Sequence, residues 1–187
     1  MKRRLIVATH NAHKLREIGE ALVGWEVTGE DSGADETSET FEGNARIKAR
    51  AIARRHPGEW VMADDSGLEV VALGGAPGVR SARYAGKDGD TAANNALLLK
   101  NLSGVKDRRA SFVCAMVLVA PDGTERTAEG RCNGRISESP SGAEGFGYDP
   151  LFVPDGCEAS FAEIPLERKN TISHRGRALA AVRAMLG

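Results

Sequence analysis

The sequence predicts an α/β fold in which helices flank a mixed β-sheet. In the first part of the chain, a short apolar run at 5–8 precedes a segment of helical periodicity at 15–22. Later, an apolar run at 112–120 is followed, after a Pro-Asp-Gly turn, by a more polar run at 124–131. This second pattern is typical of a hairpin and adds an antiparallel pair to the sheet. No internal repeat or linker interrupts the chain, so we expect one domain over residues 1–187.

Four helices are expected where apolar residues recur at helical spacing. They are the segment after the turn at 9–14, then 40–55, 90–104 and 173–186. Asp90 and Ser173 stand at two of the starts and are residue types that cap helices. Lys48 falls in the middle of the apolar stripe of the second helix.

The remaining strands are expected around a turn that contains two carboxylates. A buried strand at 61–63 would end in the turn Asp64-Asp65-Ser66-Gly67, because Asp, Ser and Gly favour loops. The alternation at 68–72 predicts a second strand, which the glycines at 74–78 break. A short strand at 151–153 completes the set.

Composition excludes several classes of protein. The chain has 187 residues, 41% of them hydrophobic, and a net charge of -1 from 25 basic and 26 acidic side chains. This balance argues against a nucleic-acid binder with a basic face. Cys114, Cys132 and Cys157 are odd in number and far apart, so neither a disulfide framework nor a zinc cluster is expected. The N-terminal apolar run of four residues is too short for a signal peptide or a membrane span, and we expect a cytoplasmic protein.

The segment 63–86 predicts a site for a polyanion. Adjacent carboxylates at Asp64 and Asp65 raise each other's pKa unless a cation neutralises them, which suggests a magnesium ion held by carboxylate oxygens. The alternative is an Asp-rich turn in water, and a DDSG turn taken alone would favour it.

Several basic side chains have the positions that a phosphate chain requires. A lysine on an apolar helical stripe, as at Lys48, either extends its tip to water or meets a buried anion. Lys14, Lys169, His174 and Arg175 lie near expected helix starts, which also favour anions. Each cation–phosphate pair contributes about 4 kcal/mol before desolvation, so together these groups could hold a triphosphate.

The loop at 145–150 carries two aromatic rings beside a carboxylate. Phe146 and Tyr148 could stack on a nucleotide base, or they could anchor the loop to the core. Ser173, His174 and Arg175 could offer donors to a base edge, or they could be a capped helix start. The P-loop, the GxGxxG fingerprint and the GxSxG elbow are all absent from the sequence.

Five blocks of sequence resemble the inosine/xanthosine triphosphate pyrophosphatases, the Ham1-type house-cleaning enzymes that act on non-canonical purine nucleotides. The blocks are THNAHK, TFEGNARIKARA, ADDSGLEVVALGGAPGVRSARYAG, GFGYDPLFVP and FAEIPLERKNTISHRGRAL. Two positions depart from the family pattern. His10 stands where a small or polar residue is usual, and Gly43 replaces a usual glutamate ahead of Asn44. The second departure leaves open whether Glu42 substitutes for that carboxylate.

The resemblance implies a fold and an activity. The family fold is an elongated mixed-sheet α/β structure of the Maf/Ham1 type, with two lobes, a substrate cleft between them and usually a homodimer. The implied reaction is Mg²⁺-dependent hydrolysis of dITP, ITP and XTP to the monophosphate and pyrophosphate. The alternatives are a pyrophosphatase for pyrimidine or modified nucleotides and a non-catalytic nucleotide sensor.

The resemblance also implies a role for individual residues. Asp65 would be the general base and a magnesium ligand, and Asp35 or Glu36 would complete the metal site. The residues implied to contact the phosphates are Thr9, His10, Asn11, Lys14 and Lys48. The residues implied to contact the rest of the nucleotide are Ser66, Phe146, Gly147, Tyr148, Asp149, Lys169, His174 and Arg175.

Overall fold

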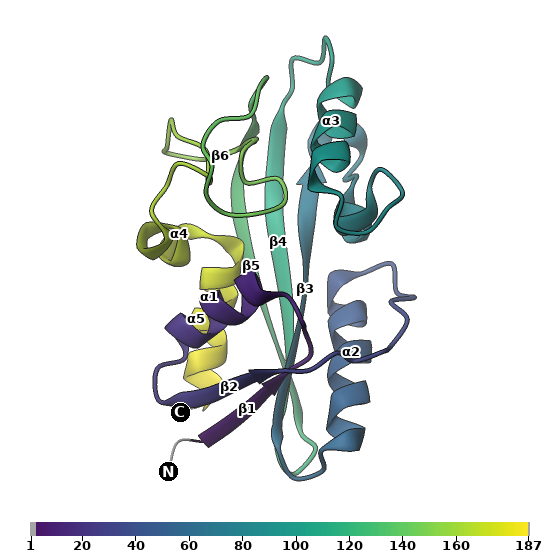
Figure 1. The fold of residues 1–187 in the computed structure, drawn as a ribbon, viewed down its shortest axis with the longest axis vertical. Coiled ribbons are helices and arrows are strands. Elements are labelled where there is room, and N and C mark those ends of the chain that lie inside the picture. The colour runs from purple at the N-terminus through teal and green to yellow at the C-terminus, as the bar shows by residue number, and fades with distance from the viewer. Residues whose placement is uncertain (1–2, 187) are drawn as a thin grey trace. The chain divides into compact units, whose positions relative to one another are not determined.

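The computed structural model describes residues 3–186, in which strands and helices alternate at first and three successive strands and two helices follow (Figure 1). The other three positions of the predicted domain lie outside the described residues. The strands are β1 (Arg3–Val7), β2 (Trp25–Gly29), β3 (Trp60–Val70), β4 (Arg109–Val119), β5 (Glu125–Ile136) and β6 (Phe152–Pro154). The helices are α1 (Ala12–Ala21), α2 (Phe41–Arg55), α3 (Thr91–Asn101), α4 (Leu166–Ile172) and α5 (His174–Leu186), with short 3-10 turns at Val71–Leu73 and Gly78–Arg83. Within this range no helix has both the length and the apolar character that a membrane span requires.

The predicted mixed sheet is confirmed. The hydrogen-bonded strand order is β2-β1-β3-β4-β5-β6. β1 pairs in parallel with both β2 and β3, whereas β5 and β6 are antiparallel. The predicted turn between β4 and β5 is also present, because the Ala120 N–H donates to the Thr124 carbonyl at 2.9 Å.

The chain divides into two compact units. Unit 1 contains the residues up to Asp65, Cys114–Gly130 and the residues from His174 onward, and unit 2 contains Ser66–Val113 and Arg131–Ser173. Strands β3, β4 and β5 contribute residues to both.

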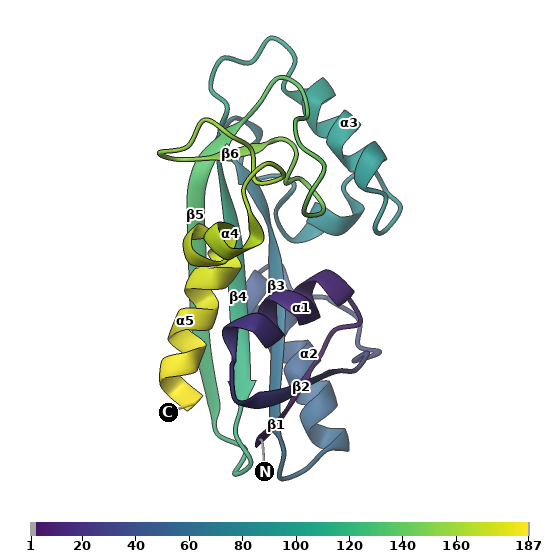
Figure 2. The ribbon, with the colours of Figure 1, turned by 60° about the vertical axis from the view of Figure 1, so that its left-hand side comes forward.

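In unit 1, strand alternation sends apolar side chains to two separate layers. Leu5, Val7 and Met62 pack with α1 and α5, which also contact each other (Figure 2). Ile6 and Val61 point the other way and pack with α2. Residues at odd and even positions of one strand therefore face different helices.

The core of unit 2 is built around aromatic rings. The rings of Phe112 and Phe152 meet edge to face at 4.7 Å between centroids, and Phe161 packs 5.1 Å from Phe152. Leucines of α3 and Tyr148 join the same buried cluster.

The structure corrects two local predictions. The DDSG segment is not a turn, because β3 continues through it from Trp60 to Val70. The predicted start of the last helix is confirmed, since α5 begins at His174, directly after Ser173, whose backbone is extended. Strand β2 and helix α4 were not predicted, because β2 mixes polar and apolar residues and α4 has only seven residues.

Candidate functional site

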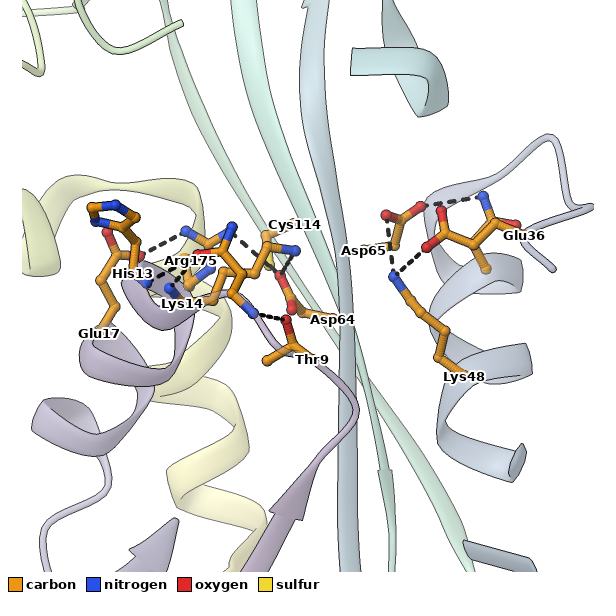
Figure 3. A network of polar contacts seen from close by, with 12 residues as sticks. Thr9, His13, Lys14, Glu17, Glu36, Lys48, Asp64, Asp65, Cys114 and Arg175 are labelled. Carbon is orange, nitrogen blue, oxygen red and sulfur yellow. Dashed lines mark hydrogen bonds and ion pairs between the residues drawn. The ribbon is translucent and has the colours of Figure 1, made fainter. Parts of the chain in front are cut away.

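The continuous strand β3 separates the two aspartates. Successive side chains of a strand point to opposite faces, so Asp64 lies on the α1 and α5 side and Asp65 lies on the α2 side (Figure 3). Asp64 pairs with Lys14 and Arg175, and Asp65 pairs with Lys48. The expectation that the two carboxylates lie together at a strand end is therefore wrong, and basic side chains lie beside each of them.

On the first side, Asp64 is buried in a network of basic groups. Its Oδ2 lies 2.9 Å from the Lys14 Nζ and 3.3 Å from the Arg175 Nη2. The Arg175 Nη1 is also 2.6 Å from the Glu17 Oε2. Burial alone would raise the pKa of Asp64, but Lys14 and Arg175 outweigh it and hold that pKa well below its usual range.

The segment before α1 is shaped as a helix cap. The Asn11 Oδ1 accepts hydrogen bonds from the backbone N–H groups of His13 and Lys14, at 2.9 and 3.2 Å. The Thr9 Oγ1 accepts from the Asn11 N–H at 3.1 Å. His10 is exposed. The cap places Lys14 in the first turn of α1, where its side chain reaches Asp64.

On the second side, Lys48 joins two carboxylates. Its Nζ lies 3.0 Å from the Glu36 Oε1 and 3.5 Å from the Asp65 Oδ1. With only 8% of Lys48 exposed, this lysine meets the buried carboxylate of Asp65 and the half-buried carboxylate of Glu36 instead of extending to water. Burial raises the pKa of Asp65, and Lys48 offsets only part of that effect. Burial would lower the pKa of Lys48, but the carboxylates around it raise that pKa overall.

The residues on this side fit a magnesium ion. Mg²⁺ prefers hard oxygen ligands and is commonly held by one or two carboxylates together with substrate phosphates. Glu36 and Asp65 already approach one cationic group, whereas Asp35 is exposed. Among residues 3–186 no group of three His, Cys, Asp or Glu side chains could hold a metal alone, so water or other oxygen ligands would complete the coordination.

Gly43 makes room for the loop that enters α2. The Thr40 Oγ1 accepts from the Gly43 N–H at 3.1 Å and lies 3.1 Å from the Ser38 Oγ. A Cβ built on Gly43 would overlap the Ser38 side chain. Glu42 instead forms a 2.6 Å ion pair with Arg46 at the surface.

We predict that Gly43→Ala destabilises the protein, although alanine is normally favoured over glycine in helices by about 1 kcal/mol. The added methyl group would displace Ser38 from the start of α2. Urea denaturation should show a lower free energy of unfolding for Gly43→Ala, with recovery when Ser38→Gly is added. A single variant as stable as the native protein would contradict this account.

In unit 2, Asp149 and Lys169 form a second buried cluster. The Lys169 Nζ lies 2.7 Å from the Asp149 Oδ2, which also accepts from the Phe146 N–H at 2.8 Å. The same ammonium lies 5.2 Å from the centroid of the Phe146 ring. Gly145 has a φ of 77°, and a Cβ there would overlap the Asp149 carboxylate, so this turn requires glycine.

The two aromatic residues of this loop differ in environment. Tyr148 belongs to the core of unit 2, and its hydroxyl donates to the Ser81 carbonyl at 2.9 Å. Burial raises the pKa of this hydroxyl. Phe146 is only half-buried. Tyr148 therefore anchors the loop, and Gly147, which accepts from the Asn95 side chain at 3.2 Å, is held with it.

The remaining predicted residues occupy separate places. Ser66 is half-buried in β3, and His174 is buried at the start of α5. Arg175 lies in unit 1 with Asp64, whereas Lys169 lies in unit 2 with Asp149. Sequence reasoning missed two buried polar partners, Glu17 and Asn44.

Sequence and structure comparisons identify relatives over nearly the whole chain. The model of the Ham1 family matches residues 5–185. A dITP/XTP pyrophosphatase of Deinococcus radiodurans is 49% identical over 99% of this chain and 94% of its own. One of Exiguobacterium is 47% identical over 97% and 95%.

Solved structures agree with these relatives. The Ham1 protein of Staphylococcus aureus is similar with a TM-score of 0.88 and 37% identity, covering 98% of both chains. The dITP/XTP pyrophosphatase of Mycobacterium abscessus has a TM-score of 0.76 and 48% identity, covering 96% of this chain and 98% of its own. The chain therefore belongs to the Ham1 family.

Proposed function

We propose that this chain hydrolyses dITP, XTP and related non-canonical purine nucleoside triphosphates to the monophosphate and pyrophosphate. The proposal rests on the contact between Asp65, a buried carboxylate of raised pKa, and Lys48. It rests also on the 49% identity of the chain to a dITP/XTP pyrophosphatase. The whole chain would act as one pyrophosphatase domain, as a homodimer in the cytoplasm. It would remove these nucleotides before they enter DNA or RNA.

The chemistry assigned to unit 1 is proton transfer and charge neutralisation. Asp65 would take a proton from the water whose oxygen attacks the α-phosphorus, while the bond to the bridging oxygen of pyrophosphate breaks. A pKa above the usual carboxyl value suits such a base. Lys14 and Lys48 would neutralise phosphate charge.

Magnesium is the proposed cofactor, and Glu36 and Asp65 would hold it. Bound there, it would supply positive charge to the phosphate oxygens and favour ionisation of water. Glu36 is chosen over Asp35 because Glu36 contacts Lys48, which also contacts Asp65. The segment from Thr9 to Lys14 would contact the phosphates through its helix start.

The cluster of unit 2 would select the base. Phe146 offers a half-buried ring for stacking, and Lys169 offers a cationic donor to a 6-oxo group. ATP presents an amino group at that position, and an unsatisfied buried donor costs about 1–3 kcal/mol. We therefore expect ATP to be a poor substrate.

The test is a panel of nucleotides with Mg²⁺, in which pyrophosphate and monophosphate are both measured. We expect kcat/KM for dITP and XTP to exceed that for ATP by about 10-fold or more. GTP, dTTP and UTP complete the panel. Preference for dTTP or UTP would indicate a pyrimidine enzyme, and binding without turnover would indicate a sensor. Either result would overturn the proposal.

A further inference from the structure

We propose that Asn44 is a positioning residue that fixes the orientation of the Asp65 carboxylate. The inference rests on the proposed function, in which Asp65 is the base. Asn44 lies in the first turns of α2 and has no exposed surface. Its Nδ2 donates to the Asp65 Oδ2 at 3.2 Å.

The amide of Asn44 is itself held from the other end. Its Oδ1 accepts from the Ser38 N–H at 2.9 Å. A backbone N–H can only donate, so this bond assigns the oxygen to the Ser38 side and the donor to the Asp65 side. A flipped amide would lose both hydrogen bonds, and leaving buried donors and acceptors without partners costs free energy. Asn44 therefore presents a fixed donor to Asp65.

This donor divides the two oxygens of Asp65 between different partners. Oδ2 accepts a hydrogen bond from the Asn44 amide, whereas Oδ1 forms the ion pair with the Lys48 Nζ, at 3.5 Å. A carboxylate held at one oxygen cannot rotate without breaking that bond. The orientation of a catalytic group affects turnover strongly, because small displacements of the reacting atoms reduce the rate. Asn44 would act on kcat through Asp65 without touching the nucleotide.

The chain contains a matched control at the start of α3. Asn94 occupies the same place relative to its N-cap, since its N–H donates to the Asp90 carbonyl as the Asn44 N–H donates to the Thr40 carbonyl. Its Oδ1 also accepts a loop N–H, from Ala85 at 2.7 Å. Its Nδ2, however, donates to the Ala82 carbonyl at 3.0 Å. Both asparagines are buried, but only Asn44 bonds a carboxylate.

The experiment compares Asn44→Leu, Asn44→Asp and Asn94→Leu in the full chain. Loss of an orienting partner typically reduces activity by about 10- to 100-fold, and we expect that loss in kcat for both Asn44 variants, with KM nearly unchanged. Binding of dITP in EDTA, measured by calorimetry, should also be unchanged. Asn94→Leu should lower the melting temperature as Asn44→Leu does, but it should keep the native kcat.

Each outcome bears on one proposal. Hydrolysis by the native chain tests the proposed function, so its absence would overturn that function first. If the native chain is active and both Asn44 variants keep its kcat, Asn44 does not position Asp65. Equal losses of kcat in Asn44→Leu and Asn94→Leu would show that lost stability is the cause. Asn44→Asp keeps the size of the side chain and the acceptor for Ser38, so it carries the test if Asn44→Leu does not fold.

Discussion

Replacing Asp65 with asparagine is expected to lower kcat for dITP by about 10²–10⁴-fold, the usual contribution of a general base. Asparagine keeps the size of the side chain but cannot accept a proton from water at neutral pH. The free energy of unfolding of Asp65→Asn should not be lower than that of the native protein. Because folding raises the pKa of Asp65, the ionised carboxylate disfavours the folded state at pH values above that pKa. A neutral amide removes this cost.

The measurement combines steady-state kinetics with urea denaturation at pH 7. Asp122→Asn is a suitable control, because Asp122 is an exposed residue of the turn between β4 and β5. That variant should keep the native kcat. If Asp65→Asn hydrolyses dITP at the native rate, Asp65 is not the base. If Asp65→Asn is inactive but also unfolded, the prediction that its stability is kept is wrong.

The sequence predicts most of the fold because its signals are periodic and local. The apolar run in β4 and the stripe of α2 each identify their element without reference to the rest of the chain. The prediction of a turn at the DDSG segment is wrong because the contacts that decide its structure are not local. Its composition favours a turn, but partners distant in sequence, such as Arg175 for Asp64, neutralise its charges within a continuous strand. A single window of sequence cannot contain that information.

The candidate site is predictable where a charge breaks an apolar pattern. Lys48 stands out for this reason, and its contact with Asp65 follows from its burial. The choice between Asp35 and Glu36 depends on how the loop before α2 runs, which the contact between Ser38 and Asn44 fixes. Asn44 itself gave no signal, because a polar residue in the first turn of a helix is ordinary.

The second large effect is expected at Arg175, which lies between two buried carboxylates. Its guanidinium pairs with Glu17 at 2.6 Å and with Asp64 at 3.3 Å. Breaking a buried pair by removing one partner costs about 3–5 kcal/mol, because the charge left behind is no longer compensated. The free energy of unfolding of Arg175→Met should therefore be lower than that of the native protein by about that amount at pH 7. A lysine at this position could not reproduce the two-pronged geometry.

The pH dependence separates this cause from a loss of packing. In the native protein the pKa of Asp64 is lowered, so its stabilising contribution is present at neutral pH and is lost only as the pH falls through the lowered value. Without Arg175, Asp64 loses one of the charges that lower its pKa, so that pKa rises and protonation relieves the variant at a higher pH than it does the native protein. The difference in the free energy of unfolding between Arg175→Met and the native protein, measured by urea denaturation, should therefore shrink as the pH is lowered. A deficit independent of pH would indicate lost packing alone.

A second substitution tests which carboxylate is responsible. Glu17→Leu added to Arg175→Met removes the charge of Glu17, the carboxylate that Arg175 pairs at 2.6 Å, while Lys14 still pairs with Asp64 at 2.9 Å. Replacing both members of a buried pair by apolar groups is often neutral, so the double variant should regain a large part of the lost stability. Arg109→Met, which removes an exposed arginine paired with Asp107, should leave unfolding unchanged. If the double variant is no more stable than Arg175→Met, Glu17 does not depend on Arg175 for its charge compensation.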